Sequence, residues 1–376
     1  MHNLLLISAI ILAESVCADP AAGVHVGLEL PPGPDNPRNS EGSFLPLKDG
    51  RILFAYSRYY GNSKSDHATA DIAARYSSDQ GRTWTTNDTI LVKNEGGMNV
   101  MSAGLLRLQS GEIALFYLRK NSTSDCRPIL RRSSDEGETW SDPTVCITDE
   151  VAYFVVNHDR VIQLKDGRLL FAASRHSFPN GRFNGRGLVM TYFSDDNGKT
   201  WRRGKSELSV RTPGGRFYSA QEPGLIQLKD GSILMWIRSN GGCQFTSRST
   251  DRGETWSSPQ PSWLASPESP ASVKRLPSGD LLAVWNDRES QPTLKKKVNP
   301  GRRTPLVSAI SRDEGKTWGN VRLIEDDPDG WFCYTALEPL DDGTVLLGYC
   351  AYKGLAHSRL VKIPIGWFYQ QAKTTE

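Results

Sequence analysis

Ionisable residues recur at one position of a repeated sequence unit. Six apolar segments are each interrupted by a tight turn that ends in glycine, at Gly50, Gly111, Gly167, Gly231, Gly279 and Gly343. The residues nine positions before these glycines are Glu41, Ser102, His158, Glu222, Pro270 and Tyr334. A purely structural barrel would favour apolar residues at equivalent positions. Two glutamates, a histidine and a tyrosine there predict a binding or catalytic pocket.

Arginines recur beyond the same turns. Seven or eight residues after the glycine lie Arg58, Arg119, Arg175 and Arg238. If the second strand of each hairpin ends beside the start of the first, these arginines share a rim with the ionisable ring. Guanidinium groups bind carboxylates in a fork geometry, so the rim is predicted to bind an anionic or heavily hydroxylated ligand. The alternative is that the arginines pair with nearby acids or are simply solvated.

The elements that must position these residues are hairpins. The six glycine turns stand between apolar runs, as in LKDGRILFAY (47–56) and LDDGTVLLGY (340–349). Aspartate followed by glycine between such runs is a strong hairpin signal. In a propeller the first strand of each blade lines the central channel, so the ionisable ring would gather at one end of that channel.

A second repeat, Ser-x-Asp-x-Gly-x-Thr-Trp, sets the size of the unit. Its glycine can adopt a positive φ, its Ser, Asp and Thr side chains can cap backbone N–H groups, and its Trp can pack between blades. Five calcium sites are the alternative, but one or two carboxylates per turn are few ligands for calcium. The spacings of 55 to 62 residues suit four short strands per unit, and the five copies are SSDQGRTW (77–84), SSDEGETW (133–140), SDDNGKTW (194–201), STDRGETW (249–256) and SRDEGKTW (311–318).

Six hairpins against five Ser-x-Asp turns predict an all-β, six-bladed propeller whose last blade lacks its own turn. The N-terminal segment VHVGLEL (24–30) would supply the missing outer strand and close the ring, which removes exposed sheet edges. Hydrophobic content of 38%, charged content of 23% and a net charge of +3 are typical of a soluble globular protein. The interspersed charges give no reason to expect nucleic acid or an anionic membrane surface as partner.

The N-terminus and the cysteines indicate the cellular compartment in which the protein is expected. Residues 1–18, MHNLLLISAIILAESVCA, are predicted to be a signal peptide cut after Ala18, with a disordered tail as the alternative. We therefore expect one propeller domain over residues 19–376, secreted or periplasmic, with no membrane span. Five cysteines remain, Cys126, Cys146, Cys243, Cys333 and Cys350, without a zinc-type pair; one or two bridges are compatible with export.

The Ser-x-Asp repeat resembles the Asp box, or BNR repeat, of the sialidase (neuraminidase) family of six-bladed propellers. QEPGLIQLKDGSILMWIR (221–238) resembles the family segment that carries the catalytic glutamate and a carboxylate-binding arginine. RRTPLVSAISRDEGKTW (302–318) resembles the segment with another such arginine. The resemblance implies these roles for Glu222, Arg238 and Arg303.

Two further segments carry the rest of the family's catalytic residues. CYTALEPLDDGTVLLGY (333–349) resembles the segment with the nucleophilic tyrosine, and SDHATADIAARYSSD (65–79) resembles the loop whose leading aspartate is the acid/base. The resemblance therefore implies Tyr334 as nucleophile and Asp66 as acid/base. Glu222 would take the phenol proton, and a neutral phenol avoids the repulsion that a carboxylate nucleophile meets at an anionic sugar.

The family's first arginine lies in a Phe-Arg-Ile-Pro type motif that is missing here. The corresponding region reads NPRNSEGSFLPLKDG (36–50), with Glu41 near the expected arginine position and Arg38 three residues upstream. Arg38 and Arg58 are the candidates to replace that arginine. His67, His158 and Asp159 are candidates for sugar hydroxyl contacts, and Trp285 and Trp331 for stacking on a sugar or for core packing.

The resemblance implies a retaining exo-α-sialidase-like hydrolase, a monomer that acts on a sialoside or related acidic sugar without metal or organic cofactor. Structural alternatives remain for each residue: a channel-lining Tyr334, a Glu222 paired with Arg238, a solvated Asp66 and an Arg303 in a basic loop. At the level of function the alternatives are a glycosidase for a different sugar with Glu41 as an extra carboxylate, a non-catalytic glycan-binding propeller, and an interaction scaffold.

Overall fold

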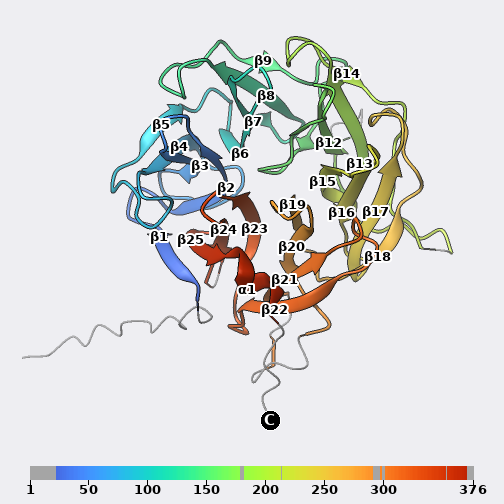
Figure 1. Ribbon diagram of the computed structural model, residues 1–376. Coiled ribbons are helices and arrows are strands. Elements are labelled where there is room, and N and C mark those ends of the chain that lie inside the picture. Colours follow the sequence, from blue (N-terminus) through green and yellow to red (C-terminus); the bar gives the residue numbers. More distant parts are fainter. Residues whose placement is uncertain are drawn as a thin grey trace, which may run out of the picture.

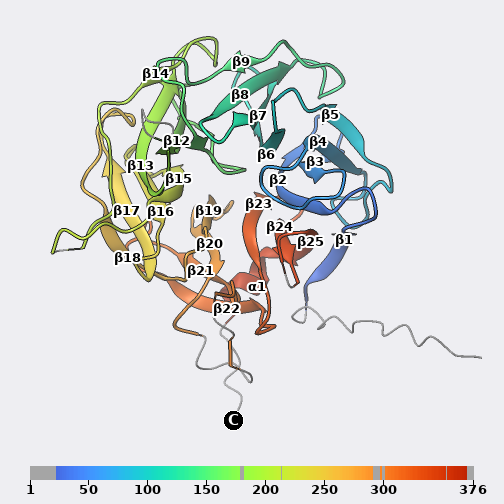
Figure 2. The ribbon, with the colours of Figure 1, turned by 180° about the vertical axis from the view of Figure 1, so that it is seen from behind.

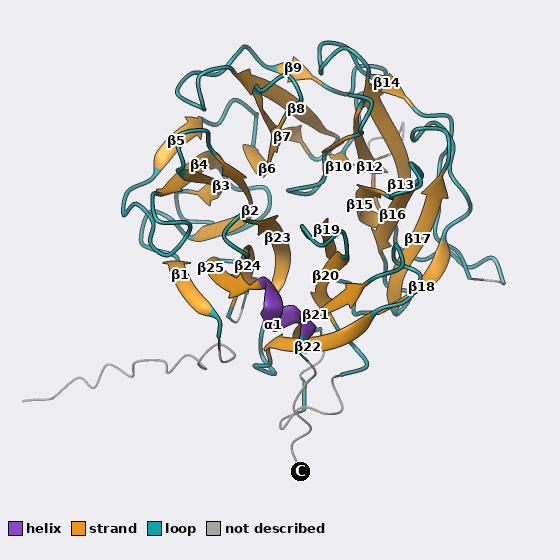
Figure 3. Cartoon of the chain, viewed as in Figure 1, coloured by secondary structure: helices purple, strands orange, loops and turns teal. Residues whose placement is uncertain are grey.

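The computed structural model describes residues 23–177, 182–212, 214–290, 297–298, 301–352 and 354–370. These residues form six separate antiparallel sheets that stand around one axis as the blades of a propeller (Figures 1 and 3). The predicted all-β, six-bladed propeller is therefore confirmed. The predicted signal peptide, residues 1–18, lies outside the described residues.

The first three blades take their strands in chain order from the axis outward. Blade 1 holds β2 (Arg38–Pro46), β3 (Ile52–Tyr59), β4 (Ala70–Ser77) and β5 (Thr89–Val92), and blade 2 holds β6 (Asn99–Arg107), β7 (Ile113–Ser122), β8 (Asp125–Ser133) and β9 (Thr144–Val145). In blade 3 the inner strand is split into β10 (Phe154–Val155) and β11 (Ile162–Gln163), which both pair with β12 (Leu169–Ser177), followed by β13 (Phe183–Ser194) and β14 (Arg202–Arg203).

Blades 4 and 5 repeat the same order, and blade 6 departs from it. Blade 4 holds β15 (Gln221–Gln227), β16 (Ile233–Arg238), β17 (Cys243–Ser249) and β18 (Gln260–Ala265), and blade 5 holds β19 (Ser272–Arg275), β20 (Leu281–Asn286), β21 (Leu306–Ser311) and β22 (Gly319–Glu325). Blade 6 holds β23 (Cys333–Pro339), β24 (Thr344–Ala351), β25 (His357–Pro364) and, outermost, β1 (His25–Leu30). The short helix α1 (Ile365–Tyr369) contacts β21 and β22.

The N-terminal strand is part of the last blade. β1 pairs antiparallel with β25, from His25 opposite Lys362 to Leu30 opposite Ser358. The two strands lie side by side from either face of the molecule (Figures 1 and 2). The segment predicted to be the outer strand therefore takes that place in the sheet.

The apolar core is divided among the junctions between blades. Six clusters of buried residues each join two neighbouring blades, so that Phe171 of blade 3 packs with Phe116 of blade 2, and Val361 of blade 6 packs with Leu282 of blade 5. Alternating inward and outward side chains along each strand supply both faces of a blade. Each blade therefore depends on its two neighbours for burial.

The five Ser-x-Asp turns share one hydrogen-bond pattern. In the turn of blade 4 the Ser249 hydroxyl accepts the Gly253 N–H at 2.9 Å, and Asp251 accepts both the N–H and the hydroxyl of Thr255. Gly253 has a φ of +86°, as predicted for this position. The indole of Trp256 reaches the Thr191 hydroxyl of blade 3 at 3.3 Å. The carboxylates are thus engaged within the turns, which supports a structural role.

Candidate active site

Four inner strands are interrupted at the positions of the ionisable ring. Glu41, Ser102, Glu222 and Tyr334 have φ values of 54°, 61°, 43° and 56°, and the pairing of each inner strand with its neighbour shifts register there. Bulges of this kind re-aim a side chain and are frequent next to active sites. The same local distortion in blades 1, 2, 4 and 6 therefore presents these four side chains at equivalent places around the channel.

Glu222, Arg238, Arg303 and Tyr334 form one buried cluster. Arg238 donates to Glu222 Oε1 at 2.7 Å, and the guanidinium of Arg303 lies 5.2 Å from the centroid of the Tyr334 ring. The other carboxylate oxygen of Glu222 is buried and has no hydrogen-bond partner among the described residues. Burial raises the pKa of Tyr334, and the negative charge of Glu222 raises it further against the charges of Arg303 and Arg238. The structure thus places a neutral phenol in the electrostatic field of a carboxylate with a free oxygen.

Arg38, Glu41 and Asp66 form a second group beside this cluster. Arg38 pairs with the carboxylate of Asp66 through NH1 and lies 3.7 Å from Glu41 Oε1 through NH2, while the Ser102 hydroxyl donates to Glu41 Oε2 at 2.8 Å. Burial raises the pKa of Glu41 to about 7, although Arg38 opposes the rise. Burial would also raise the pKa of Asp66, but the charge of Arg38 lowers it overall. Glu41 interacts electrostatically with Glu222, which joins the two groups into one site.

Two residues of blade 2 that sequence reasoning missed hold the Asp66 loop. Lys120 Nζ and Asn99 Nδ2 donate to the backbone oxygen of Asp66 at 2.6 and 2.9 Å. Both side chains are buried, and the Lys120 ammonium lies 5.3 Å from the Tyr153 ring. The Asp66 side chain itself is 57% exposed, so its loop is anchored while its carboxylate faces solvent. A lysine at the end of a strand that begins with an apolar run was the available signal for this role.

Of the three secondary candidates, His158 and His67 border this group, whereas Asp159 is engaged elsewhere. His158 is fully buried between Asn157 and the backbone oxygen of Thr335, and burial lowers its pKa to about 3. The centroid of its neutral ring lies 6.0 Å from that of the Tyr334 ring, in an edge-on contact that supports the tyrosine. These contacts leave no part of the His158 ring for a sugar. Asp159 pairs with Lys274 Nζ at 3.1 Å, and the side chain of His67 is exposed.

The arginine rim is corrected by the structure. Arg58, Arg119 and Arg175 pair with nearby acids, respectively Asp88 at 2.9 Å, Glu95 at 3.8 Å and Glu150 at 2.7 Å. Only Arg238 of the four joins the buried cluster, because it stands seven residues beyond its glycine instead of eight and so points to the other face of its strand. Of the two candidates of blade 1, Arg38 lies beside Glu41 and Asp66, whereas Arg58 is engaged by Asp88.

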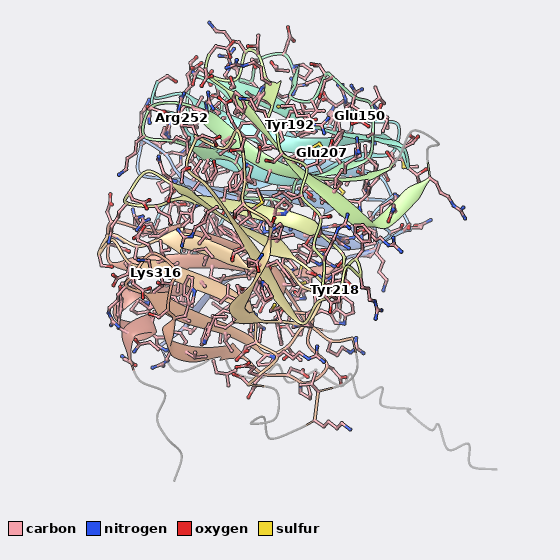
Figure 4. All side chains as sticks on the ribbon, turned by 90° about the vertical axis from the view of Figure 1, so that its right-hand side faces the viewer. Glu150, Tyr192, Glu207, Tyr218, Arg252 and Lys316 are labelled. Carbon is pink, nitrogen blue, oxygen red and sulfur yellow. The ribbon has the colours of Figure 1, made fainter. Side chains whose placement is uncertain are left out.

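The site and the Ser-x-Asp turns belong to opposite faces of the propeller. In the side view, Arg252 and Lys316 of two Ser-x-Asp turns lie toward one face (Figure 4). Glu150, which pairs with Arg175 near the end of β12, lies toward the other. The hairpin strands thus separate the structural turns from the end of the channel that holds the ionisable ring.

A pocket of about 650 Å³ opens beside the site, over blades 6 and 1. Arg38 and Asp66 form one wall, and Trp331 and Tyr352 contribute aromatic side chains. Trp331 is half-buried and covers the guanidinium of Arg303 at 5.1 Å, whereas Trp285 is a core residue that is 1% exposed. Asp66 therefore lines a space large enough for a sugar.

A profile described as BNR repeat-like domain matches residues 36–347, which include all six ring positions. The chain belongs to the BNR repeat-like domain family. Curated sialidases are relatives of this BNR-repeat chain: that of Bacteroides fragilis is 26% identical over 338 residues, covering 80% of the chain and 57% of the relative. The sialidase of Clostridium perfringens is 29% identical over 296 residues, covering 72% and 70%.

Solved structures share the fold of this BNR-repeat chain. A Hadza microbial sialidase aligns with a TM-score of 0.69 at 20% identity, covering 88% of this chain and 66% of that one. A protein of unknown function from Dyadobacter fermentans aligns with a TM-score of 0.70 at 18% identity, covering 91% and 100%. The chain spans 57% and 59% of the length of two curated relatives, the sialidases of Bacteroides fragilis and Paraclostridium sordellii. None of the helices in the described ranges is long and apolar enough to cross a membrane.

Proposed function

We propose that this protein is a sialidase-like glycoside hydrolase that cleaves a terminal acidic sugar with retention of configuration. The observation that carries the proposal is the buried cluster of Tyr334, Glu222, Arg238 and Arg303, in which Glu222 keeps one oxygen without a partner among the described residues. The sialidase relatives favour a sialoside as the substrate. The proposed mechanism and substrate follow from the chemical role that each of these side chains can take.

Tyr334 is the proposed nucleophile. Its phenol is neutral at ordinary pH because its pKa is raised, so attack on the anomeric carbon requires a base. The free oxygen of Glu222 takes the phenol proton as the bond to the sugar forms. A neutral attacking group also avoids the repulsion that two anions would experience when the sugar carries a carboxylate at the anomeric carbon.

Asp66 is the proposed acid/base. It lies beside Arg38 in the wall of the open pocket, where the leaving group would sit. After it protonates the leaving oxygen, the same carboxylate activates water to release the sugar from Tyr334. Arg38 holds this carboxylate charged, so proton donation requires that the pair loosen when substrate binds.

Arg238 and Arg303 are the proposed carboxylate-binding arginines. Arg303 has no carboxylate within ion-pair distance among the described residues, so its charge is available to a ligand. Arg38 is engaged by Asp66 and lies near Glu41. The site thus offers two arginines deep in the channel and one at its edge.

A glycosidase for a different sugar is the second candidate, and Glu41 is the observation that favours it. Its buried carboxyl occupies the ring position equivalent to those of Glu222 and Tyr334, in place of the arginine that the sialidase motif has there. With a pKa of about 7 it can donate or accept a hydrogen bond near neutral pH. Glu41 would then form a hydrogen bond with a hydroxyl or amide group of a sugar whose binding requires fewer arginines.

Hydrolysis of a fluorogenic α-sialoside by wild type, Tyr334→Phe and Tyr76→Phe tests the proposal. Tyr76 lies on blade 1 under Arg51 and serves as the matched control. We expect Tyr334→Phe to lower kcat about 10³-fold or more and Tyr76→Phe to leave it unchanged. A slow fluorinated substrate should leave its sugar on Tyr334 in a peptide map.

Other outcomes separate the alternatives. Equal turnover by wild type and Tyr334→Phe would overturn the tyrosine mechanism. Wild-type turnover of a different glycoside that is lost in Glu41→Gln would favour the second candidate. Saturable glycan binding without any turnover would identify a binding propeller.

A further inference from the structure

Two cysteines face each other beside the proposed nucleophile. Cys333 precedes Tyr334 in β23 and stands directly opposite Cys350 in β24. Both are free thiols, both are buried, and together with Tyr334 they form a separate small cluster. Directly paired residues on antiparallel strands have Cα atoms roughly 4.5–5.5 Å apart, within the range that a disulfide can bridge.

The Arg303 guanidinium is held by the side chains of both Cys333 and Tyr334. Arg303 NH1 donates to Cys333 Sγ at 3.2 Å, and the rings of Trp331 and Tyr334 lie 5.1 and 5.2 Å from the guanidinium. Arg238, by contrast, is held by the carboxylate of Glu222 at 2.7 Å. A sulfur and two aromatic rings therefore fix the one arginine of the site that no carboxylate holds.

The second cysteine supports the first. Cys350 stands opposite Cys333, and the Ser40 hydroxyl lies 3.4 Å from Cys350 Sγ. Burial alone would raise the pKa of Cys333, but the neighbouring Cys350 thiol and the charge of Arg303 lower it to about 7. Burial and the neighbouring sulfur raise the pKa of Cys350. The pair therefore has the asymmetry of an attacking thiolate and a resolving thiol.

We propose that Cys333 and Cys350 form an oxidisable dithiol whose reduced state positions Arg303 and whose disulfide state removes that support. The role of Arg303 in ligand binding rests on the proposed function, whereas the dithiol itself does not. In the reduced state Cys333 acts as a positioning residue, because it acts on the ligand through Arg303. In the disulfide state its sulfur is bonded to Cys350, carries no charge and is a weaker acceptor.

A peroxide is the oxidant that suits a buried pair, because it is small. The Cys333 thiolate attacks one peroxide oxygen, the O–O bond breaks, and the sulfur becomes a sulfenic acid while the other oxygen leaves as hydroxide and takes a proton to become water. The Cys350 thiol then attacks the Cys333 sulfur, the S–O bond breaks, and a second water leaves. Two thiols and one hydrogen peroxide thus give one disulfide and two waters.

Peptide mapping after treatment of the folded protein with hydrogen peroxide tests the dithiol without any assay of activity. We expect a peptide linked through Cys333 and Cys350, which dithiothreitol cleaves and which Cys350→Ser does not form. Cys243 is a half-exposed thiol of blade 4, so Cys243→Ser is the matched control and should leave the linked peptide unchanged. Absence of the linked peptide at peroxide levels that oxidise Cys243 would overturn the proposal.

The positioning of Arg303 is tested by ligand binding and by the split between KM and kcat. We expect oxidation to weaken the binding of free sialic acid and to raise KM for an α-sialoside about tenfold with a smaller change in kcat, reversed by dithiothreitol. Cys333→Ala should raise KM in the same way, and Cys333→Ser should restore part of the loss because a hydroxyl oxygen still accepts from Arg303.

Two results separate a failure of this inference from a failure of the proposed function. If the protein with the Cys333–Cys350 disulfide binds sialic acid as tightly as the reduced protein, the proposed role of Cys333 in positioning Arg303 is overturned. A protein that neither binds nor turns over any acidic sugar would contradict the proposed function, and the peptide map would still decide whether the dithiol exists.

Discussion

Arg238 lies seven residues beyond Gly231, whereas Arg58, Arg119 and Arg175 lie eight residues beyond their hairpin glycines. Successive side chains of a strand point to opposite faces, so a difference of one residue moves a guanidinium from one face of a blade to the other. Arg58 accordingly pairs with Asp88, which also accepts from Arg75 and Tyr56. At the scale of the residue, position within the strand decides which arginine enters the site.

This difference leads to a paired prediction. Arg238→Lys removes the guanidinium that pairs with Glu222 Oε1 and is proposed to bind the substrate carboxylate. We therefore expect kcat/KM to fall about 10- to 100-fold, as for loss of a charged hydrogen bond of about 1.5–3 kcal/mol. Arg58→Lys keeps an ion pair with Asp88 and should leave kcat/KM within about twofold. Steady-state kinetics of both variants are the measurement, and an equal loss in the two would contradict the assignment of Arg238.

Two kinds of tight turn, a hairpin turn in every blade and a Ser-x-Asp turn in five of the six, place a glycine at positive φ. Three hairpin glycines, Gly50, Gly231 and Gly343, lie in open space, and Gly231 has a φ of +86°. Gly253 of a Ser-x-Asp turn has the same φ, but a Cβ there would lie 2.8 Å from a methyl group of Leu170 in the preceding blade. At the scale of the element, the Ser-x-Asp turn is therefore a contact between blades as well as a turn.

Gly231→Ala and Gly253→Ala separate these two demands. Each variant carries the backbone strain of a positive φ, which costs about 1–2 kcal/mol. Gly253→Ala must also displace Leu170 from a packed junction, which adds about 1–3 kcal/mol. Denaturant unfolding should therefore show a larger loss in the free energy of unfolding for Gly253→Ala than for Gly231→Ala. Equal losses would mean that Leu170 can be displaced from the junction without a loss of stability.

Ring closure buries charged groups along the axis of the whole molecule. Each of the six apolar clusters lies between two blades, so the inner strands are held close together around the channel. Glu41 stands at one depth of this channel, and Glu338 pairs with Lys274 at 3.8 Å at another. Burial raises the pKa of both carboxyls to about 7. The propeller therefore binds protons that its unfolded chain releases.

The stability of the molecule should consequently depend on pH. The pKa of Glu41 rises from 4.5 in the unfolded chain to about 7 in the folded protein, so between these values the folded state holds more protons. The free energy of unfolding should therefore fall as pH rises from about 4.5 to 7, by at most about 3 kcal/mol from Glu41 alone, and stay lower above pH 7.

Urea unfolding at pH 5 and pH 8 measures this effect. Glu41→Gln should lose less stability than wild type between the two values, because the amide does not titrate and still accepts from Ser102. Glu138→Gln, a change at an exposed side chain of a Ser-x-Asp turn, is the control and should follow wild type. A variant Glu41→Gln with the full wild-type dependence would show that Glu41 is not the linked group.

Local signals in the sequence determined the architecture. Glycine turns between apolar runs and five copies of Ser-x-Asp-x-Gly-x-Thr-Trp determine where each chain segment reverses, because few residues tolerate the required backbone angles. The count of six hairpins and five turns was sufficient to predict the number of blades and the place of residues 24–30. Counting back from the hairpin glycines also picked out Glu41, Glu222 and Tyr334, because equivalent positions of the inner strands lie at the same depth of the channel.

Tertiary structure alone decided which side chains meet. The pairing of Arg38 with Asp66, the anchoring of the Asp66 loop by Lys120 and the contact of Arg303 with Cys333 join residues from loops and different blades. A shift of one residue along a strand moves a side chain to the other face of the sheet, and loop residues follow no regular period. The spacing of residues in the sequence therefore carries no information about these contacts. Burial likewise depends on neighbouring blades, which is why only the folded propeller reveals a raised pKa at Glu41 and a neutral His158.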